Sequence, residues 1–205
     1  VQLRFTPVFH GKALVIQEEP TSPVQADIGT FRCYLSAFTL MENDTVVWAE
    51  KNNFHLLDAV DPASLEVDLA APQHVKYDAV RFQLGIDSLT SVSGALGGDL
   101  DPTKGMYWAW NSGYINLKLE GHSPKSAGRN GAFEFHLGGY LPPYATARTI
   151  VVHRCGPGVQ HITIDLDQFL GAVDLQAQNN EISPGKAAYD LSLILATIFH
   201  CSDAR

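Results

Sequence analysis

The sequence predicts a mostly β protein: a single-domain antiparallel β-sandwich over residues 1–205, with one C-terminal helix. Three observations lead to this prediction. Short runs rich in Val, Ile, Phe and Tyr recur between turn residues, which is typical of sandwiches. Helical periodicity is clear only near the C-terminus. The length of 205 residues fits one domain, and no linker divides the chain.

Ten short apolar segments, each bounded by turn residues, are expected to be strands. In residues 115–120 and 132–137, apolar and polar side chains alternate, so each strand has one face directed at the core. The polar loop 121–131 would join these two strands into a hairpin. Gly156-Pro157-Gly158 would form a tighter hairpin turn between its flanking strands. The expected strands are Gln2–Phe9, Phe31–Leu40, Thr45–Trp48, Phe54–Asp58, Leu65–Leu69, Ala79–Leu84, Ile115–Glu120, Ala132–Leu137, Thr149–His153 and Val159–Asp165.

The C-terminal helix is expected to have Ser183 as its N-cap and Pro184 at its first position. Six apolar residues then recur at helical spacing and indicate one buried face. They are Ala187, Leu191, Ile194, Leu195, Ile198 and Phe199. A single short helical turn is also expected within residues 101–110, after Pro102.

Composition excludes several kinds of partner. The net charge is −8 and the isoelectric point is about 5.4, so no basic surface is available for nucleic acid. No apolar run approaches the roughly 20 residues that span a bilayer. The three cysteines leave at least one free thiol or an intermolecular bridge, and their spacing does not pair them. The chain begins at Val1 without a methionine, which is typical of a mature N-terminus after signal-peptide removal or of a trimmed chain. Together with the low Lys content and the many β signals, this favours an exported protein.

The segment from Gly97 to Gly121 is the most informative part of the chain, because it contains a W-A-W triplet, Trp108 to Trp110, after Met106 and Tyr107. A buried indole N–H needs a partner, so two Trp residues beside turn glycines indicate a shaped site. The same pattern is also compatible with aromatic core packing or with a platform on which a flat ligand stacks.

Two histidines stand in strand-like runs, His55 in FHLLD and His136 in FHLGG. Imidazole is the commonest metal ligand, and a two-His site suits copper or zinc. The ordinary interpretation is that each is a hydrogen-bonded strand histidine. Asp99 and Asp101 are candidates for a calcium ion, but the more usual role of such a pair is a turn in which Asp101 caps a helical turn.

Enzyme signatures are missing from the sequence: it has no G-x-S-x-G, H-E-x-x-H, Walker loop or G-x-G-x-x-G motif. No spacing of Ser, His and Asp singles out a catalytic triad either, so hydrolysis is disfavoured.

Several segments together resemble the MbnP-like family of bacterial copper-binding proteins, which was named from methanobactin operons. The specific segment is GGDLDPTKGMYWAWNSGYINLKLEG, with its W-x-W motif. FEFHLGGY, the late ISPGKAA, FRCYLSAFTL, FHLLDAVDPASLEV and VRFQLGIDSL follow the family's order of elements, although each is generic alone. The resemblance extends from about Phe5 to Phe199.

The resemblance implies a periplasmic, secreted or cell-surface bacterial protein that binds a single Cu(I) in copper acquisition or homeostasis, without catalytic turnover. The first Trp of the motif, here Trp108, would be oxidised to kynurenine by a di-haem partner of the cytochrome c peroxidase/MauG type. Ring opening creates an aniline amine whose lone pair is free to bind metal. By motif, His55 and His136 complete the ligand set, with His153 in reserve. Neutral imidazoles suit Cu(I), which accepts few ligands.

The neighbours of Trp108 would then surround the site. Trp110 is the second Trp of the motif, and Met106 has a thioether, although core packing is its more usual role. Tyr107 is a candidate for a radical-transfer route to the surface, a hypothesis that an unchanged kynurenine yield in Tyr107→Phe would exclude. If the two central strands pair, His136 falls near Asn116, eight residues after Trp108. The segment 105–113 must therefore fold back for these side chains to meet.

Two other functions are compatible with the sequence. One is a ligand- or carbohydrate-binding β-sandwich in which Trp108 and Trp110 form a stacking platform, which requires intact indoles and no copper. The other is a copper redox enzyme, which requires an open coordination position. Only the first function, Cu(I) binding, predicts that Trp108→Phe loses copper binding while the fold is kept.

Overall fold

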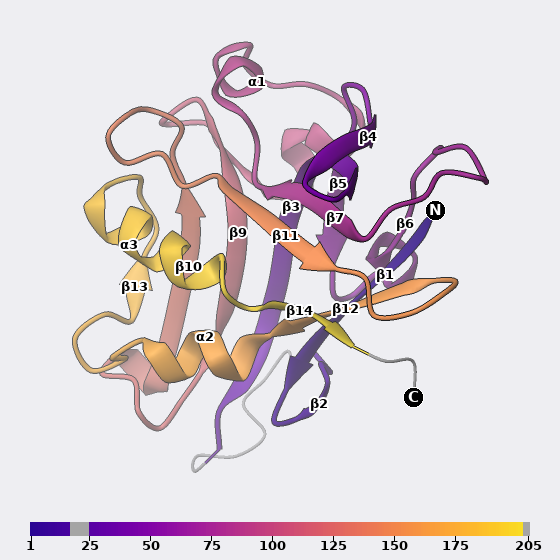
Figure 1. Ribbon diagram of the computed structural model, residues 1–205. Coiled ribbons are helices and arrows are strands. Elements are labelled where there is room, and N and C mark those ends of the chain that lie inside the picture. The colour runs from indigo at the N-terminus through magenta and orange to yellow at the C-terminus, as the bar shows by residue number, and fades with distance from the viewer. Residues whose placement is uncertain (17–24, 203–205) are drawn as a thin grey trace.

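The computed structural model describes residues 1–16 and 25–202, and within them it contains two β-sheets and three α-helices (Figure 1). The strands are β1 (Gln2–Phe9), β2 (Lys12–Ala13), β3 (Asp27–Glu42), β4 (Thr45–Ala49), β5 (Phe54–Asp58), β6 (Glu66–Asp68), β7 (Ala79–Leu84), β8 (Tyr107–Trp108), β9 (Gly113–His122), β10 (Ala132–Gly138), β11 (Arg148–His153), β12 (Gln160–Asp165), β13 (Asn180–Glu181) and β14 (Phe199–Ser202). The helices are α1 (Ser88–Val92), α2 (Leu166–Ala172) and α3 (Lys186–Leu195), and the 3-10 turns are η1 (Pro62–Leu65), η2 (Gly98–Leu100), η3 (Pro102–Lys104) and η4 (Arg129–Gly131).

The smaller sheet has the strand order β14–β12–β1–β2, with β6 also paired to β1. The larger sheet has the order β11–β7–β3–β9–β10–β13, with β4 and β5 paired to β3 and β8 paired to β9. The mostly β sandwich is therefore confirmed. The sheets are mixed rather than purely antiparallel, because β1 and β12 are parallel, as are β10 and β13. Each parallel pair joins segments that are distant in sequence and connected by crossovers.

The core fills the space between the two sheets. Phe5 on β1 contacts Phe82 on β7 edge to face, with ring centroids 5.8 Å apart. We call the side of the larger sheet that meets the smaller sheet its inner face, and the opposite side its outer face. On β10, Phe133, Phe135 and Leu137 are fully buried on the inner face, as their alternation predicts. Burial of this continuous apolar cluster is the main force that holds the sheets together.

The hairpin of β9 and β10 forms across the loop 121–131, as predicted. Its register places His136 opposite Lys118, two residues from the expected position at Asn116. In contrast, the hairpin predicted at Gly156-Pro157-Gly158 is wrong. β11 pairs with β7 in the larger sheet, whereas β12 pairs with β1 and β14 in the smaller one. This turn therefore carries the chain from one sheet to the other, since the apolar faces of both strands contact the core.

Helix α3 differs from its prediction at both ends. It begins at Lys186 after Gly185, so Ser183 and Pro184 precede it and Ser183 does not cap it. Pro184 instead packs on Gly139, where an added Cβ would lie 2.8 Å from the proline Cβ. The helix ends at Leu195, because Phe199 pairs with Ile164 as the start of β14. Apolar spacing continues past the helix end because the following strand is buried against the same core.

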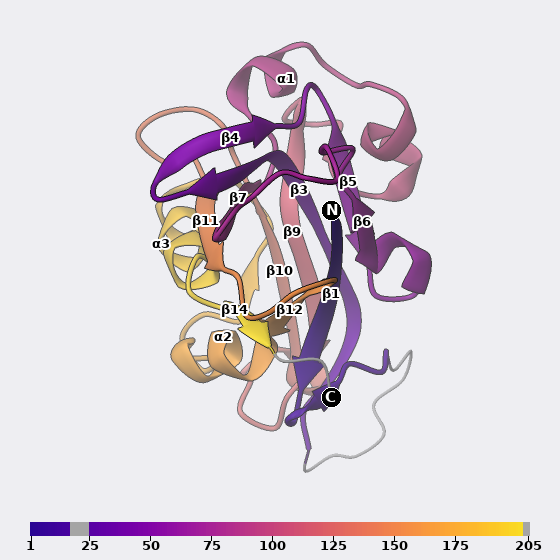
Figure 2. The same cartoon turned by 45° about the vertical axis from the view of Figure 1, so that its right-hand side comes forward.

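The remaining helices lie at opposite ends of the molecule. Helix α2, which was not among the elements expected from the sequence, packs beside α3, and α1 lies at the other end (Figures 1 and 2). The predicted turn after Pro102 is present as η3, capped by the Asp101 side chain. None of the described helices is long and apolar enough to cross a membrane.

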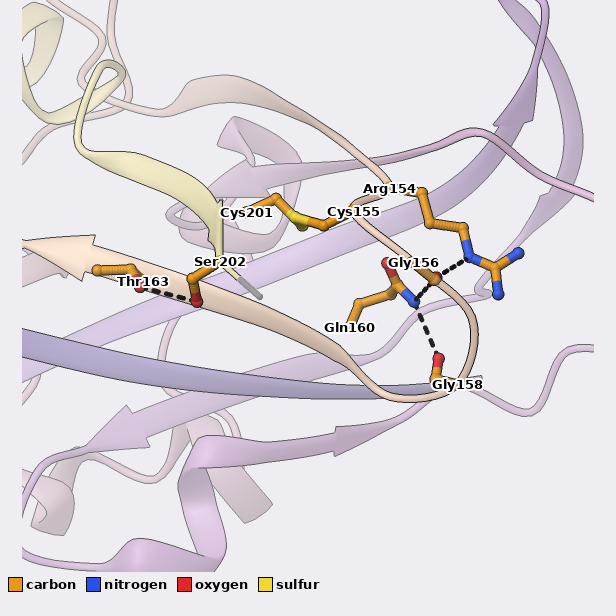
Figure 3. The surroundings of a disulfide bond; sticks show 8 residues. All are labelled: Arg154, Cys155, Gly156, Gly158, Gln160, Thr163, Cys201 and Ser202. Atoms are coloured by element: carbon orange, nitrogen blue, oxygen red, sulfur yellow. Dashed lines mark hydrogen bonds between the residues drawn. A yellow bond between two sulfur atoms is a disulfide. The ribbon is translucent and has the colours of Figure 1, made fainter. Parts of the chain in front are cut away.

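The structure pairs the cysteines that the sequence leaves open. Cys155 and Cys201 form a disulfide across 46 residues, which ties β14 to the connection between β11 and β12 (Figure 3). Gln160 donates to the carbonyls of Gly156 and Gly158 and so closes the same turn. Cys33 is a free, fully buried thiol on β3, and burial raises its pKa far above the ordinary value.

Candidate functional site

The W-A-W segment folds back on itself, as the predicted site requires. Strand β8 pairs with the start of β9, so that Tyr107 lies opposite Tyr114 and Trp108 opposite Gly113. Gly105 ends η3 with φ +72°, a left-handed conformation that glycine adopts without strain. The result is a short hairpin that lies over the outer face of the larger sheet.

The two indoles of this hairpin have different surroundings. The ring of Trp108 is 6% exposed, whereas Trp110 is 67% exposed. Their ring centroids are 5.7 Å apart and their planes are tilted by 46°. The Trp108 ring lies against the backbone of β10 at Gly138, where an added Cβ would be only 2.7 Å from Cζ3 of Trp108. Glycine is therefore required here for the indole to approach the strand.

A second apolar cluster supports Trp108 on the outer face. Met106 is fully buried in it, together with the rings of Tyr34 and Tyr114. Burial raises the pKa of both tyrosines, so they are neutral, and each hydroxyl donates to a backbone carbonyl. Tyr107 is half-buried, and its ring packs edge to face on Tyr114 at 5.0 Å. The cluster fixes the hairpin to the sheet without a charged group inside it.

His136 lies on the same outer face, since its strand neighbours Phe135 and Leu137 are on the inner face. Its Nε2 is 2.6 Å from Oε1 of Glu120, which also pairs with Lys118 at 3.3 Å. The hydrogen bond from His136 is the main cause that lowers the pKa of Glu120 from 4.5 to about 2, against the opposing effect of burial. Glu120 therefore stays ionised at neutral pH and holds the imidazole in one orientation.

Trp108 and His136 are brought to neighbouring positions on this face. Gly138, which contacts the Trp108 ring, follows His136 by two residues on β10. Residues two apart on a strand project to the same side. The Trp108 ring and His136 therefore meet the same strand, β10, at positions two residues apart, although 28 residues separate them in the sequence.

His55 is on the other side of the sheet. It pairs with Leu35 on β3, and its partly exposed ring packs edge to face on Phe38 of the inner core, 5.4 Å away. Its Nε2 is 3.0 Å from Glu50. Burial raises the pKa of Glu50, but hydrogen bonds from His55 and Asn53 outweigh it, and the net shift is downward. The structure therefore does not bring His55 and His136 together.

The other predicted positions are also placed. His153 is exposed at the end of β11. Asp101 accepts from the backbone and hydroxyl of Thr103, as expected of a helix cap. Asp99 accepts from the backbone N–H of Leu56 and pairs with Lys104. Across the described ranges, no group of three or more His, Cys, Asp or Glu residues is arranged to hold a metal ion.

Three residues of the site were not predicted from the sequence. Glu120 and Glu50 hold the two histidines, and Gly138 makes room for Trp108. For Glu120 a signal was present, because it stands with His136 on the polar side of two strands that were expected to pair. Nothing in the sequence pointed to the role of Gly138.

The fold and site define a class: a β-sandwich in which a W-x-W hairpin lies on the outer face of the larger sheet. A family model named MbnP matches residues 1–184, and the chain belongs to the MbnP family. Among solved structures, MbnP from Methylosinus trichosporium is similar in fold, with a TM-score of 0.62 and 19% identity over 92% of this chain and 81% of that one. No curated protein matches the chain.

Proposed function

We propose that this protein binds a single Cu(I) ion beside the W-x-W hairpin, through His136 and a kynurenine formed from Trp108, and that it serves copper acquisition or homeostasis. The observation that carries the proposal is the placement of buried Trp108 over Gly138, on the same sheet face as His136. Membership of the MbnP family supports it.

The donor chemistry of this face fits Cu(I). An intact indole N–H is a poor ligand, whereas the aniline amine of kynurenine has a free lone pair. His136 offers a neutral imidazole, and Cu(I) is satisfied by two or three soft or borderline ligands. The apolar cluster of Met106, Tyr34 and Tyr114 on the outer face keeps water from the side of the site that contacts the sheet. The bound copper would not take part in a catalytic cycle, and the protein would act as a copper carrier rather than as an enzyme.

Glu120 is the positioning residue of this site. Because it accepts a hydrogen bond from Nε2 of His136, it fixes the ring orientation and favours metal binding through Nδ1. A carboxylate that orients a ligating histidine in this way also raises the basicity of the ligand. His55 has an equivalent partner in Glu50, but on the inner face, away from Trp108.

The proposed location is the periplasm or the cell surface. A disulfide such as Cys155–Cys201 forms and persists in oxidising compartments and is rare in the cytosol (Figure 3). The oxidation of Trp108 is assigned to a separate partner, a di-haem enzyme of the cytochrome c peroxidase/MauG type.

The geometry disfavours a carbohydrate-stacking platform. With Trp108 at 6% exposure and the two rings tilted by 46°, only Trp110 presents an accessible ring face. The two tryptophans do not form a flat double surface.

The test is a comparison of copper content and peptide mass. Protein expressed together with its di-haem partner should carry one copper per chain and kynurenine at Trp108. Trp108→Phe should fold and bind no copper, and His136→Gln should keep the kynurenine but lose copper. The matched control is His122→Gln. His122 is also a strand histidine beside a carboxylate, that of Asp27, so the substitution removes the same kind of side chain. Full copper content in Trp108→Phe would exclude the kynurenine ligand.

A further inference from the structure

The oxidation of Trp108 raises a problem of access. Trp108 is only 6% exposed, and the benzo edge of its ring packs on Gly138, so little of this residue is open to an external enzyme. The neighbouring Trp110 is 67% exposed, and its ring centroid is 5.7 Å from that of Trp108. The second Trp of the motif therefore bridges the covered ring and the surface.

Tyr107, the candidate that the sequence suggests for such a route, is less suited to it. It is adjacent to Trp108 on β8, and adjacent strand residues point to opposite sides. Its ring contacts Tyr114, which is 2% exposed, rather than Trp108. A route through Tyr107 therefore lacks the ring-to-ring contact that Trp108 makes with Trp110.

We propose that Trp110 is an electron relay through which Trp108 is oxidised without direct contact with the oxidant. This inference rests on the proposed function, because it concerns the formation of the kynurenine. In each step a high-valent haem of the peroxidase partner takes one electron from Trp110, and Trp110 regains it from Trp108. The iron is reduced by one electron, and Trp110 ends unchanged.

The complete reaction balances with hydrogen peroxide as the terminal oxidant. Four such steps, with two waters as the oxygen source, convert the Trp108 indole into N-formylkynurenine and release four protons. Two molecules of hydrogen peroxide accept the four electrons and four protons and become water. Hydrolysis of the formyl group then gives kynurenine and formate.

The test compares Trp110→Phe with Trp110→Tyr. Both variants keep an aromatic ring at an exposed position, but only tyrosine is readily oxidised by one electron. We expect Trp110→Phe to lose most of the kynurenine at Trp108 after co-expression with the di-haem enzyme, and Trp110→Tyr to recover it. Tyr107→Phe is one control, and Trp48→Phe is the other, because Trp48 is the remaining tryptophan and lies on β4, outside the W-x-W hairpin. Both should retain the wild-type yield. Thermal unfolding of each variant checks that the fold is kept.

A second measurement separates electron transfer from docking of the partner. Photogenerated ruthenium(III) tris-bipyridine is a small soluble oxidant that needs no protein contact surface. It should oxidise Trp108 in the wild type and leave it largely intact in Trp110→Phe, as measured by peptide mass.

Equal modification of Trp108 in wild type and Trp110→Phe would overturn the relay but not the copper site. Equal loss in Trp110→Phe and Trp110→Tyr would also overturn it, because a contact role then explains the effect. Absence of kynurenine from the wild type co-expressed with the enzyme would overturn both proposals.

Discussion

The indole of Trp108 lies against the backbone of Gly138, so closely that a Cβ at this glycine would be 2.7 Å from Cζ3 and 3.0 Å from Cη2 of the ring. This contact joins the W-x-W hairpin to β10, the strand that contains His136. It converts two motifs that are separate in the sequence into one site.

Gly138→Ala should therefore displace Trp108. The added methyl group meets both the ring and the carbonyl oxygen of Tyr114, which would be 2.5 Å from the new Cβ. We expect a loss of about 1–3 kcal/mol in the free energy of unfolding, as for other overpacked sites, together with weaker copper binding. Denaturant unfolding and copper titration measure the two effects. Gly156→Ala is the matched control, because nothing lies within 4 Å of its Cβ. Equal stability of the two variants would contradict the contact.

His136 and His55 should differ in their effect on copper. They lie on opposite faces of the larger sheet, and only His136 shares a face with Trp108. His136→Gln should therefore abolish most copper binding, whereas His55→Gln should retain it and lose only its hydrogen bond with Glu50. Competitive titration with a Cu(I) chelator measures both. If His55→Gln lost copper as completely as His136→Gln, the site would have to involve the inner face as well.

The stability of the protein should depend on pH through Glu120. Its pKa is lowered from 4.5 in an exposed chain to about 2 in the folded protein. A lowered carboxyl pKa stabilises the fold above pH 4.5, and this contribution is lost as the pH falls toward 2. Since the side chain is 30% exposed, we expect about 1–2 kcal/mol after solvent screening.

Glu120→Gln should thus lower the stability at pH 7 and leave it nearly unchanged near pH 2. Denaturant unfolding at several pH values gives the difference between wild type and variant. A constant difference across this pH range would show that Glu120 acts by packing rather than by charge.

The disulfide should contribute strongly to stability. Cys155 and Cys201 close a loop of 46 residues, for which the chain-entropy model gives about 4 kcal/mol, with about 2–4 kcal/mol typical of measured cases. The double variant Cys155→Ser/Cys201→Ser should unfold at correspondingly lower denaturant concentration. The same experiment with reductant on wild type should give the same shift.

Thiol labelling checks the pairing independently. The buried Cys33 should not react with iodoacetamide in the native protein, and unfolding without reductant should expose this thiol alone. Labelling of Cys155 or Cys201 under those conditions would contradict the assigned bridge.

The sequence by itself determined ten of the strands, the hairpin of β9 and β10, the Asp101 cap and the special character of the W-x-W segment, but not β2, β8, β13 or β14. All of these depend on local rules: alternation with a period of two, turn residues between strands, and a short carboxyl side chain before a helical turn. The family resemblance added Trp108, His55 and His136 as predicted ligands. The family is confirmed, whereas the ligand set stays a prediction.

Apart from the hairpin of β9 and β10, tertiary structure alone decided which strands are neighbours, and it decided which face of the larger sheet each histidine occupies. Alternation shows which neighbours share a strand face with His55 and with His136. It does not show that the two histidines lie on opposite faces of the sheet, because this depends on the long-range pairing of their strands with β3 and β9. The same limit explains the hairpin wrongly predicted between β11 and β12 and the apolar residues of β14 assigned to the helix. A local pattern indicates that a residue is buried. Which strand or helix covers that residue depends on the packing of the whole chain.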